Sequence, residues 1–424
     1  MTPSGANGMN VVKTINFIIS MVFMLCYAYQ FVYIVIPFII KEKKHSPARL
    51  NRFAVLIAAR NEENVIGHLI KSIKDQTYPA DCIDIYVVAD NCTDSTAQVC
   101  REAGVNVYER FNKELVGKGY ALDFLIEKIC ESNEDGYYDG YFVFDADNVL
   151  EENFIYEMNR TFCDGHNIVT SYRNSKNYGD NWISAGYALW YVRESRFLNN
   201  ARHLINASCA VSGTGFLFSH SILKECGGWK FFLLTEDIEF SAHNIIKGEK
   251  IAFCRGAMLY DEQPVKFRQS WRQRLRWSKG FLQVLRKHGV DLIKGIFRGS
   301  YSCYDLAMNI MPAMFLSLAC IILDLGFGIY YLSIGESPIV LLQAVLQILL
   351  TAYTTLFLVG SIATVTEWDN IYCPTWKKIL YAFTFPLFMM TYIPISIQAL
   401  LTKVEWKPIE HSRSQSLDDI RNSK

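Results

Sequence analysis

The stretch YFVFDADN, residues 141–148, decides which fold this sequence adopts. Residues 141–144 are all favoured in strands, and they lead directly into two aspartates that flank Ala146. Side chains at positions i and i+2 of an extended chain share a face, so Asp145 and Asp147 point the same way. Two carboxylates at the end of a buried strand are costly unless a cation lies between them. The pattern indicates a cation-binding strand end, although an ordinary solvated turn after a strand would have the same local sequence.

Strands and helices alternate around this stretch. Strands are predicted at 53–59, 83–89, 105–108 and 141–144, and helices at 61–76, 94–103 and 117–130. This alternation predicts an α/β fold with a mostly parallel sheet covered on both faces. Ligands of such sheets bind at the carboxyl ends of the strands. Three of the predicted ends carry polar clusters: Arg60-Asn61-Glu62, Asp90-Asn91 and Asp145-Ala146-Asp147.

Apolar segments lie on both sides of the α/β region. Residues 11–40 contain one charged residue, Lys13, and are long enough to cross a bilayer as a helix. Basic residues follow this segment, so the positive-inside rule places the chain from residue 41 onward in the cytoplasm. Further apolar stretches at 304–333, 337–366 and 379–401 are each long enough to span.

These patterns predict a multi-pass protein of the cell membrane with a cytoplasmic α/β domain. Three spans after that domain would put the C-terminus outside, whereas the basic residues of the tail favour the inside, so the side of the tail stays open. The expected segments are a disordered N-terminus at 1–10, a transmembrane anchor at 11–40, the α/β domain at 41–262, interfacial amphipathic helices at 263–300, about three transmembrane helices at 301–402 and a tail at 403–424.

Composition narrows the function classes. The 42 basic and 42 acidic residues cancel, so no overall field points to nucleic acid. The 12 cysteines are dispersed and contain no Cys-x-x-Cys pair, which argues against a zinc site and for reduced thiols in the cytosol.

The residues themselves indicate three pieces of chemistry. The pair Asp145 and Asp147 suits Mg²⁺ or Mn²⁺ holding a diphosphate, because these ions prefer oxygen ligands and keep substrate phosphates in their shell. Lys118, in Gly117-Lys118-Gly119, could contact the same phosphates, although it could also be an ordinary surface lysine. Asp237 lies at the start of a predicted helix, 237–246, that Thr235 can cap, and such a position favours the charged carboxylate that a general base needs.

The third piece is a basic, tryptophan-bearing helix at 266–287. Gln273, Arg276 and Trp277 share one face at i, i+3 and i+4. They supply an amide, a guanidinium that can fork a phosphate, and an aromatic platform for a sugar ring. A helix of this composition also commonly lies in the headgroup plane of a membrane.

In order and approximate spacing, these motifs resemble those of membrane-bound family 2 glycosyltransferases. That group comprises the processive cellulose, chitin and hyaluronan synthases and their bacterial exopolysaccharide relatives. The resemblance covers about 55–287 and implies a nucleotide-sugar-binding GT-A domain. It is carried by Glu62, Asp90, Lys118, Asp145-Ala146-Asp147, Thr235-Glu236-Asp237 and Gln273-x-x-Arg276-Trp277.

The resemblance also implies a role for each residue. Asp237 would be the catalytic base of a single inverting displacement, and Asp147 would bind Mg²⁺ or Mn²⁺. The UDP part of the donor would contact Ala58, Arg60, Glu62, Asp90, Lys118 and Asp145. The diphosphate and the acceptor would contact Gly213, Thr214, Glu236, Gln273, Arg276 and Trp277, and Gly215 and Gly228-Trp229 look like acceptor-side loops.

The expected function is therefore transfer of sugar from a UDP-sugar to a growing β-linked polysaccharide, with export of the product. One alternative is transfer of a single sugar to a lipid acceptor, a polyprenyl phosphate or a glycolipid, and another is an inactive membrane transport or scaffold protein. The sequence has one span before the α/β domain where several large synthases have two or more, and it has no clear copy of the cellulose synthases' Phe-x-Val-Thr-x-Lys loop. Export by this chain alone, a homo-oligomer and the identity of the donor sugar are left open.

Overall fold

An eight-stranded sheet forms the centre of the protein, which we describe from a computed structural model covering residues 3–42, 45, 47–310, 312–333, 335, 338–409 and 411–423. The strand order is β3-β2-β1-β4-β7-β6-β8-β5. The strands are β1 (Phe53–Ala59), β2 (Ile83–Asp90), β3 (Asn106–Arg110), β4 (Gly140–Asp145), β5 (Val149–Leu150), β6 (Ile168–Ser175), β7 (Phe216–Ser219) and β8 (Ile251–Asp261).

Most of the strand pairs in this sheet are parallel. The pairs β1–β2, β1–β4, β2–β3 and β6–β8 are parallel, whereas β7 runs antiparallel to both β4 and β6, and β5 runs antiparallel to β8. The prediction of a mostly parallel α/β sheet is confirmed. The register places Ala58 of β1 opposite Asp145 of β4, so the polar strand ends meet at one edge.

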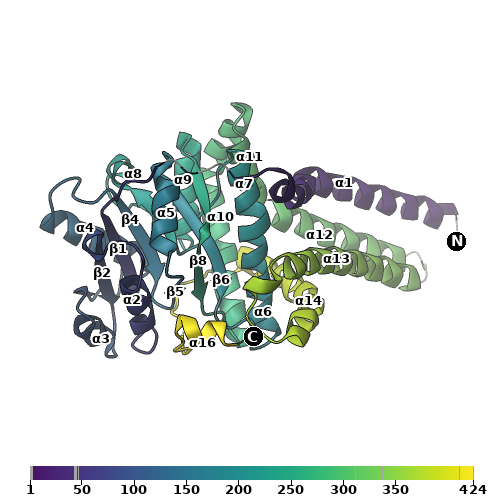
Figure 1. Ribbon diagram of the computed structural model, residues 1–424. Coiled ribbons are helices and arrows are strands. Elements are labelled where there is room, and N and C mark those ends of the chain that lie inside the picture. The colour runs from purple at the N-terminus through teal and green to yellow at the C-terminus, as the bar shows by residue number, and fades with distance from the viewer. Residues whose placement is uncertain are drawn as a thin grey trace.

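Helices cover both faces of the sheet (Figure 1). Successive residues of β1 enter different cores, with Leu56 in one cluster and Val55 in the other, which explains why the strand reads as a continuous apolar run. Helices α2 (Ile66–Lys74), α3 (Thr96–Glu102) and α5 (Phe154–Cys163) supply residues to the core that holds Val55, and α4 (Lys118–Ser132), α8 (His220–Cys226), α9 (Glu236–Lys247) and α10 (Phe267–Phe297) supply residues to the other.

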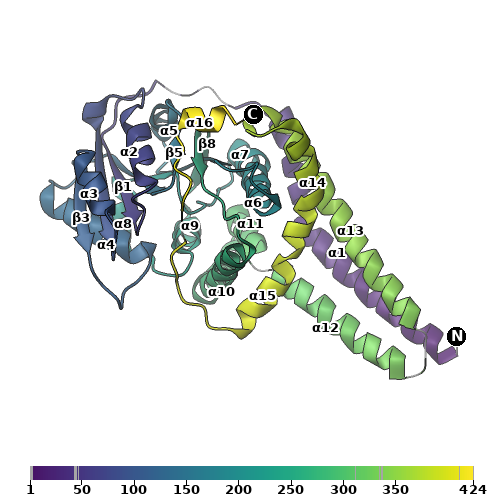
Figure 2. The same cartoon turned by 90° about the horizontal axis from the view of Figure 1, so that it is seen from below.

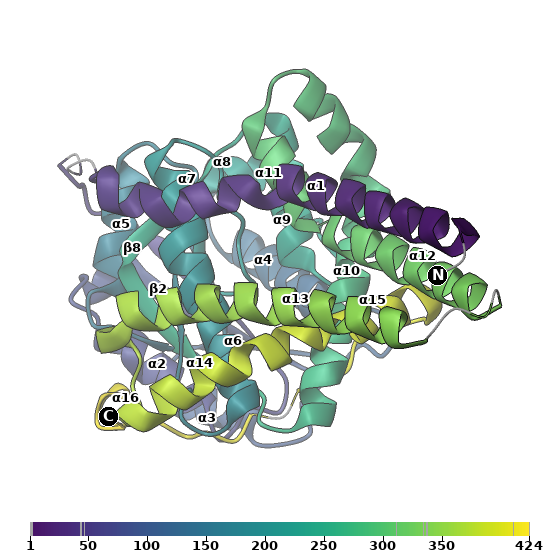
Figure 3. The same cartoon turned by 90° about the vertical axis from the view of Figure 1, so that its right-hand side faces the viewer.

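Long apolar helices extend from one side of the α/β domain (Figures 1 and 2). They are α1 (Pro3–Ile39), α12 (Pro312–Ser333), α13 (Pro338–Thr366), α14 (Thr375–Met390) and α15 (Tyr392–Leu401). Among the described residues, the stretches Phe17–Ile39, Val345–Thr366 and Thr375–Leu401 are long and apolar enough to cross a membrane. Helix α1 packs on α7 (Asn200–Leu204), and α13 and α14 pack on α6 (Trp182–Arg193), as Figure 3 shows.

Three predictions about these segments are corrected. Residues 3–10, predicted to be disordered, are helical, and residues 1 and 2 lie outside the described part. The predicted span at 304–333 does not lie wholly among the apolar helices, because Asp305 in its first part, α11 (Tyr301–Ile310), is buried against Arg202. The predicted interfacial helix also has a face inside the protein, since Arg274 of α10 is fully buried and lies over the ring of Phe388.

The C-terminal tail returns to the α/β domain. It ends in α16 (Leu417–Arg421), whose Ile420 is buried with Val149 and Tyr260. Arg421 pairs with Glu152 at 2.9 Å. The tail therefore lies on the same side of the apolar helices as the α/β domain.

Candidate active site at the strand ends

A cavity of about 550 Å³ opens at the carboxyl ends of β1, β2 and β4. It continues past α10 toward the apolar helices, where Tyr27, Leu318 and Ile393 line it. Nearly all the predicted site residues line this single cavity: Ala58, Arg60, Glu62, Asp90, Lys118, Asp145, Asp147, Gly213, Glu236, Asp237, Gln273, Arg276 and Trp277. Residues that are 219 positions apart in the sequence, from 58 to 277, are thus brought to one surface.

Lys118 lies beside the first aspartate of the pair. It begins α4, and its ammonium pairs with Asp145 and donates to the carbonyl of Gly213 at 2.7 Å. Both partners line the cavity, so the ammonium is held at its wall rather than in bulk solvent. A positive charge at this position can contact a donor's phosphates.

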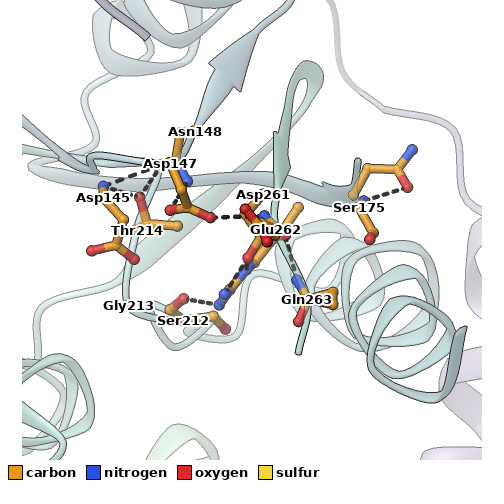
Figure 4. Close-up of polar contacts among 12 residues, drawn as sticks. Asp145, Asp147, Asn148, Ser175, Ser212, Gly213, Thr214, Asp261, Glu262 and Gln263 are labelled. Carbon is orange, nitrogen blue, oxygen red and sulfur yellow. Dashed lines mark hydrogen bonds and ion pairs between the residues drawn. The ribbon is translucent and has the colours of Figure 1, made fainter. Parts of the chain in front are cut away.

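Asp147 is the more deeply buried aspartate, 4% exposed. One carboxylate oxygen accepts the main-chain N–H of Glu262 at 2.7 Å (Figure 4). Burial alone would raise the pKa of Asp147, but His411, Lys176 and that N–H favour the charged form and hold the pKa below its ordinary value. Asp147 is therefore a carboxylate at neutral pH.

The donor set fits a divalent metal that is shared with a substrate. The carboxylates of Glu62, Asp145, Asp147, Asp261 and Glu262 all line the cavity, and hard oxygen ligands suit Mg²⁺ or Mn²⁺. Within the described part of the chain, no group of three or more His, Cys, Asp or Glu residues is arranged to hold an ion alone. An ion bound by Asp145 and Asp147 would take its remaining ligands from the donor's diphosphate and from water.

A second acidic wall comes from the end of β8, a strand that is not among those predicted from the sequence. Asp261 pairs with Arg173 of β6, which also donates to the carbonyl of Ser212 at 2.5 Å and stacks 3.8 Å from the ring centre of Tyr191. Burial and the charge of Asp147 raise the pKa of Asp261 to about 6, although Arg173 opposes the shift. The signal was present as Asp261-Glu262 at a strand end, the same pattern that identified the other clusters.

Asp237 occupies the first turn of α9, as predicted. Burial raises its pKa, while the N–H of Ile238, Lys118 and Arg276 favour the charged form. A Cβ atom on Gly213 would lie 3.8 Å from a carboxylate oxygen of Asp237, so this carboxylate faces the Gly213 loop. The same loop holds Lys118, which places the candidate base next to the candidate phosphate contact.

The predicted cap of α9 is wrong. Thr235 is the N-cap residue, but its side chain makes no capping bond, and its hydroxyl has no hydrogen-bond partner among the described residues. A Cβ atom on Gly280 would lie 2.4 Å from Cγ2 of Thr235. Thr235 is therefore a packing residue that fits against the bare backbone of α10.

The Gln-x-x-Arg-Trp residues of α10 face the cavity. Arg276 donates to the carbonyl of Leu234 at 2.7 Å, just before the Asp237 turn. Trp277 meets Tyr187 edge-on with ring centres 5.7 Å apart. Oε1 of Gln273 is buried without a hydrogen-bond partner in the described part of the protein, so it is available to a ligand.

Two predicted acceptor residues lie elsewhere. Thr214 is 3% exposed, and its hydroxyl accepts the N–H of Asp145 at 2.9 Å and donates to Asn148, so it supports the aspartate turn from below (Figure 4). Trp229 is a core residue stacked on Phe240 with ring centres 5.3 Å apart. Asp90 does line the cavity, but it is buried in an ion pair with Arg110 at 2.5 Å.

The tail also contributes to the cavity, which no local pattern indicated. Nδ1 of His411 lies 2.9 Å from Oε1 of Glu62. Burial would lower the pKa of His411, yet Asp147 and Glu62 outweigh it and raise the pKa to about 10. The tail residues that line the cavity are Trp406, Lys407, Pro408, Ile409 and His411.

Comparison with known proteins gives a consistent result. The chain is 28% identical over 269 residues to the probable glycosyltransferase YdaM of Bacillus subtilis, which covers 58% of this chain and 59% of that protein. It is 24% identical over 267 residues to the poly-β-1,6-N-acetyl-D-glucosamine synthase of Staphylococcus epidermidis, with 61% and 63% covered. It is 23% identical over 280 residues to the β-monoglucosyldiacylglycerol synthase of Nostoc sp., with 63% and 57% covered. The chain thus spans about three fifths of the length of these relatives.

A solved mannosyltransferase of Pyrobaculum calidifontis, in complex with GDP-mannose and Mn²⁺, shares the fold. It has a TM-score of 0.55 and 14% identity, and the similarity covers 93% of this chain and 98% of that one. Residues 50–280, more than half of the 424-residue chain, match the model described as glycosyltransferase like family 2. The chain therefore belongs to glycosyltransferase family 2 and has a GT-A-like fold.

Proposed function

We propose that this glycosyltransferase moves a sugar, with inversion, from a UDP-sugar to the end of a growing β-linked polysaccharide. The observation that carries the proposal is the Gly213 loop, which lies beside both the candidate phosphate contact, Lys118, and the candidate base, Asp237. Its carbonyl accepts from Lys118 at 2.7 Å, and its Cα faces the carboxylate of Asp237. A phosphate contact and a proton acceptor that both lie beside Gly213 fit a single displacement.

The residues of this chain divide the work between leaving group and nucleophile. Asp145 and Asp147 would hold Mg²⁺ or Mn²⁺, which would stabilise the negative charge of the departing diphosphate. Lys118 adds a positive charge on that side. Asp237 accepts the proton of the acceptor hydroxyl as its oxygen bonds to the anomeric carbon and the bond to the diphosphate breaks. The raised pKa of Asp237 makes it a better proton acceptor near neutral pH.

The acceptor end of the cavity supports a glycan. Trp190, Tyr191, Trp277 and Tyr392 line it. Aromatic rings offer flat apolar faces on which sugar rings pack, with Tyr and Trp polar groups at the edges. Tyr27 of α1 and Ile393 of α15 line the same cavity, so the cavity reaches the apolar helices. We therefore include in the proposal that the product passes between these helices.

A lipid acceptor is the second candidate, because the end of the cavity near the apolar helices is lined by aliphatic residues. Its lining there includes Leu306, Ile310, Leu318, Ile397 and Leu400. A polyprenyl phosphate or a glycolipid could place its chain among these side chains and its head at Asp237.

Product size separates the two acceptors. Membranes that contain the protein are incubated with each labelled UDP-sugar in turn, with Mg²⁺ or Mn²⁺ and with a chelator, and the products are resolved by length. Long labelled chains formed only with metal are expected. Labelled lipid carrying a single sugar would contradict the polysaccharide proposal, and release of GDP but not UDP from a parallel donor panel would contradict the proposed nucleotide.

A further inference from the structure

The segment between α15 and α16, described at residues 402–409 and 411–413, runs along the part of the cavity lined by Glu62, Asp145 and Asp147. We call this part the donor end of the cavity and the segment the return segment. Figure 2 shows it in yellow, passing from α15 at the apolar helices to α16 on the α/β domain. Five of its residues line the cavity: Trp406, Lys407, Pro408, Ile409 and His411. A chain that only wrapped the outside of the domain would not place successive residues on this wall.

Three carboxylates hold the return segment. Both oxygens of Glu62 lie within reach of Nδ1 of His411, at 2.9 and 3.1 Å. The main-chain N–H groups of Ser412 and Arg413 donate to Glu262 at 3.0 and 2.8 Å. The guanidinium of Arg413 pairs with Asp180 at 2.7 Å.

The two ends of the segment are fixed by other contacts. On one side α15 packs against α10, and Gln398 of α15 accepts from Trp271 at 2.6 Å. On the other side, Ile420 of α16 is fully buried. The return segment therefore crosses the donor end of the cavity and is anchored to the rest of the protein at both of its ends.

The holding carboxylates belong to the donor end itself. The N–H of Glu262, whose side chain binds the return segment, also donates to Asp147 at 2.7 Å. Trp406 lies over the guanidinium of Arg60 at 5.2 Å from its ring centre. Nη1 of Arg60 is buried and has no hydrogen-bond partner among the described residues, so a donor group is left for a ligand beneath Trp406.

We infer that the return segment is part of the donor site, and that the nucleoside diphosphate binds beneath it in contact with Trp406 and His411. Glu62 and Glu262 then act as positioning residues that hold the segment over the nucleotide. This positioning role is additional to the uridine contact predicted for Glu62. The inference rests on the proposed function only in taking a nucleoside diphosphate as the ligand.

Nucleotide affinity tests the two contacts directly. UDP binding to the purified full-length protein is measured by calorimetry with Mn²⁺, for wild type, Trp406→Ala, His411→Ala and the control Glu405→Ala. Glu405 is exposed and lies outside the cavity lining. We expect each of the first two variants to bind UDP about tenfold more weakly, the scale of one charge-assisted contact, and the control to bind as wild type does. Equal UDP affinity in all four proteins would overturn the inference.

The anchoring role of Glu62 has its own readout. Glu62→Gln keeps an acceptor for His411, whereas Glu62→Ala removes it. UDP affinity should fall in the alanine variant and be largely recovered in the glutamine variant, and equal affinity in the two would contradict the positioning role.

Limited proteolysis measures how accessible the return segment is in the wild-type protein. This test needs no substitution that could impair folding. Trypsin can cut after the exposed Lys403 and Arg413, while Lys407 is shielded because Pro408 follows it. UDP with Mn²⁺ should slow both cuts, because a ligand that binds beneath the segment stabilises its docked state. Unchanged cutting at saturating UDP would overturn the inference. If the wild type bound neither UDP nor GDP, the proposed function would fail with it, whereas binding without any effect of the variants would refute only the role of the segment.

Discussion

Nη1 of Arg276 donates to the main-chain carbonyl of Leu234 at 2.7 Å. Leu234 lies three residues before Asp237, so the Gln-x-x-Arg-Trp helix and the turn that carries the candidate base are joined directly. The bond crosses from α10 to the start of α9, where Thr235 also meets Gly280. The Gln-x-x-Arg-Trp motif and the Asp237 turn, which are separated in the sequence, are therefore in direct contact in the fold.

Removing this bond should slow turnover more than it weakens donor binding. Arg276→Ala should reduce kcat by about 10- to 100-fold, the range for a hydrogen bond with a charged donor, because the Asp237 turn loses its tie to α10. Arg276→Lys cannot reproduce the planar donor geometry and should recover only part of the rate. Arg272→Ala, an exposed change on the same helix, is the control. Steady-state kinetics with UDP-sugar would contradict the role if Arg276→Ala changed only KM.

The candidate base can be separated from a structural aspartate by one substitution. Asp237→Asn keeps the size of the side chain but cannot accept the acceptor's proton, so turnover should fall by about 10²- to 10⁴-fold while UDP affinity stays near the wild-type value. Glu225→Gln, an exposed change on α8, should have no effect. Equal turnover in Asp237→Asn would refute the assignment. A wild type that binds UDP yet forms no product with any donor would favour an inactive scaffold.

The neighbouring acid, Glu236, should make stability depend on pH. Burial, together with the charge of Asp237, raises its pKa from 4.5 to about 7. The folded protein then binds more protons than the unfolded chain between these values, so Glu236 lowers stability as pH rises from about 4.5 to about 7. Glu236→Gln should therefore raise Tm more at pH 8 than at pH 5, with a free-energy gain of about 3 kcal/mol at most. Thermal unfolding in detergent at both pH values measures it, and an equal change at both would contradict the shift.

A buried ion pair joins the first helix to the rest of the protein. Arg202 donates to Asp305 at 2.6 Å, and the hydroxyls of Tyr29 and Tyr33 donate to the same carboxylate. Asp305→Ala leaves the guanidinium buried without its partner and should cost about 3–5 kcal/mol of unfolding free energy. Asp291→Ala, which breaks an exposed pair with Lys294, should cost less than about 1 kcal/mol. Thermal unfolding compares them, and a double change to methionine at positions 202 and 305 should recover part of the loss if the unpaired charge is the cause.

Local patterns identified the strand-end residues that the fold brings to one cavity, but not the residues that surround them. Asp145, Asp147 and Lys118 could be found because a strand end and a helix start fix their direction within a few residues. The antiparallel strand β7 has only four residues, too few for its period to be distinctive. Thr214 was misplaced because its glycine neighbours suggested a loop, whereas its hydroxyl is bonded under the Asp145 turn. His411 could not be found at all, since it contacts Glu62 across 349 positions and only the tertiary return of the tail brings them together.

The close approach of α9 and α10 provides the sharpest test of the geometry. A Cβ atom on Gly280 would lie 2.4 Å from Cγ2, 2.5 Å from Oγ1 and 2.9 Å from Cβ of Thr235. Rotation of the Thr235 side chain cannot relieve the last contact, so either α10 or the backbone at Thr235 must shift. Gly280→Ala should therefore move the Asp237 turn away from Arg276 and reduce kcat by at least about tenfold, even though alanine favours a helix over glycine by about 1 kcal/mol. Gly67→Ala is the matched control, because a Cβ atom there meets nothing within 4 Å. Thr235→Ala removes the two closest atoms and should restore part of the rate when combined with Gly280→Ala. Wild-type turnover in Gly280→Ala would show that α9 can move without loss of function. The close contact between the Asp237 turn and α10 would then not be required for catalysis.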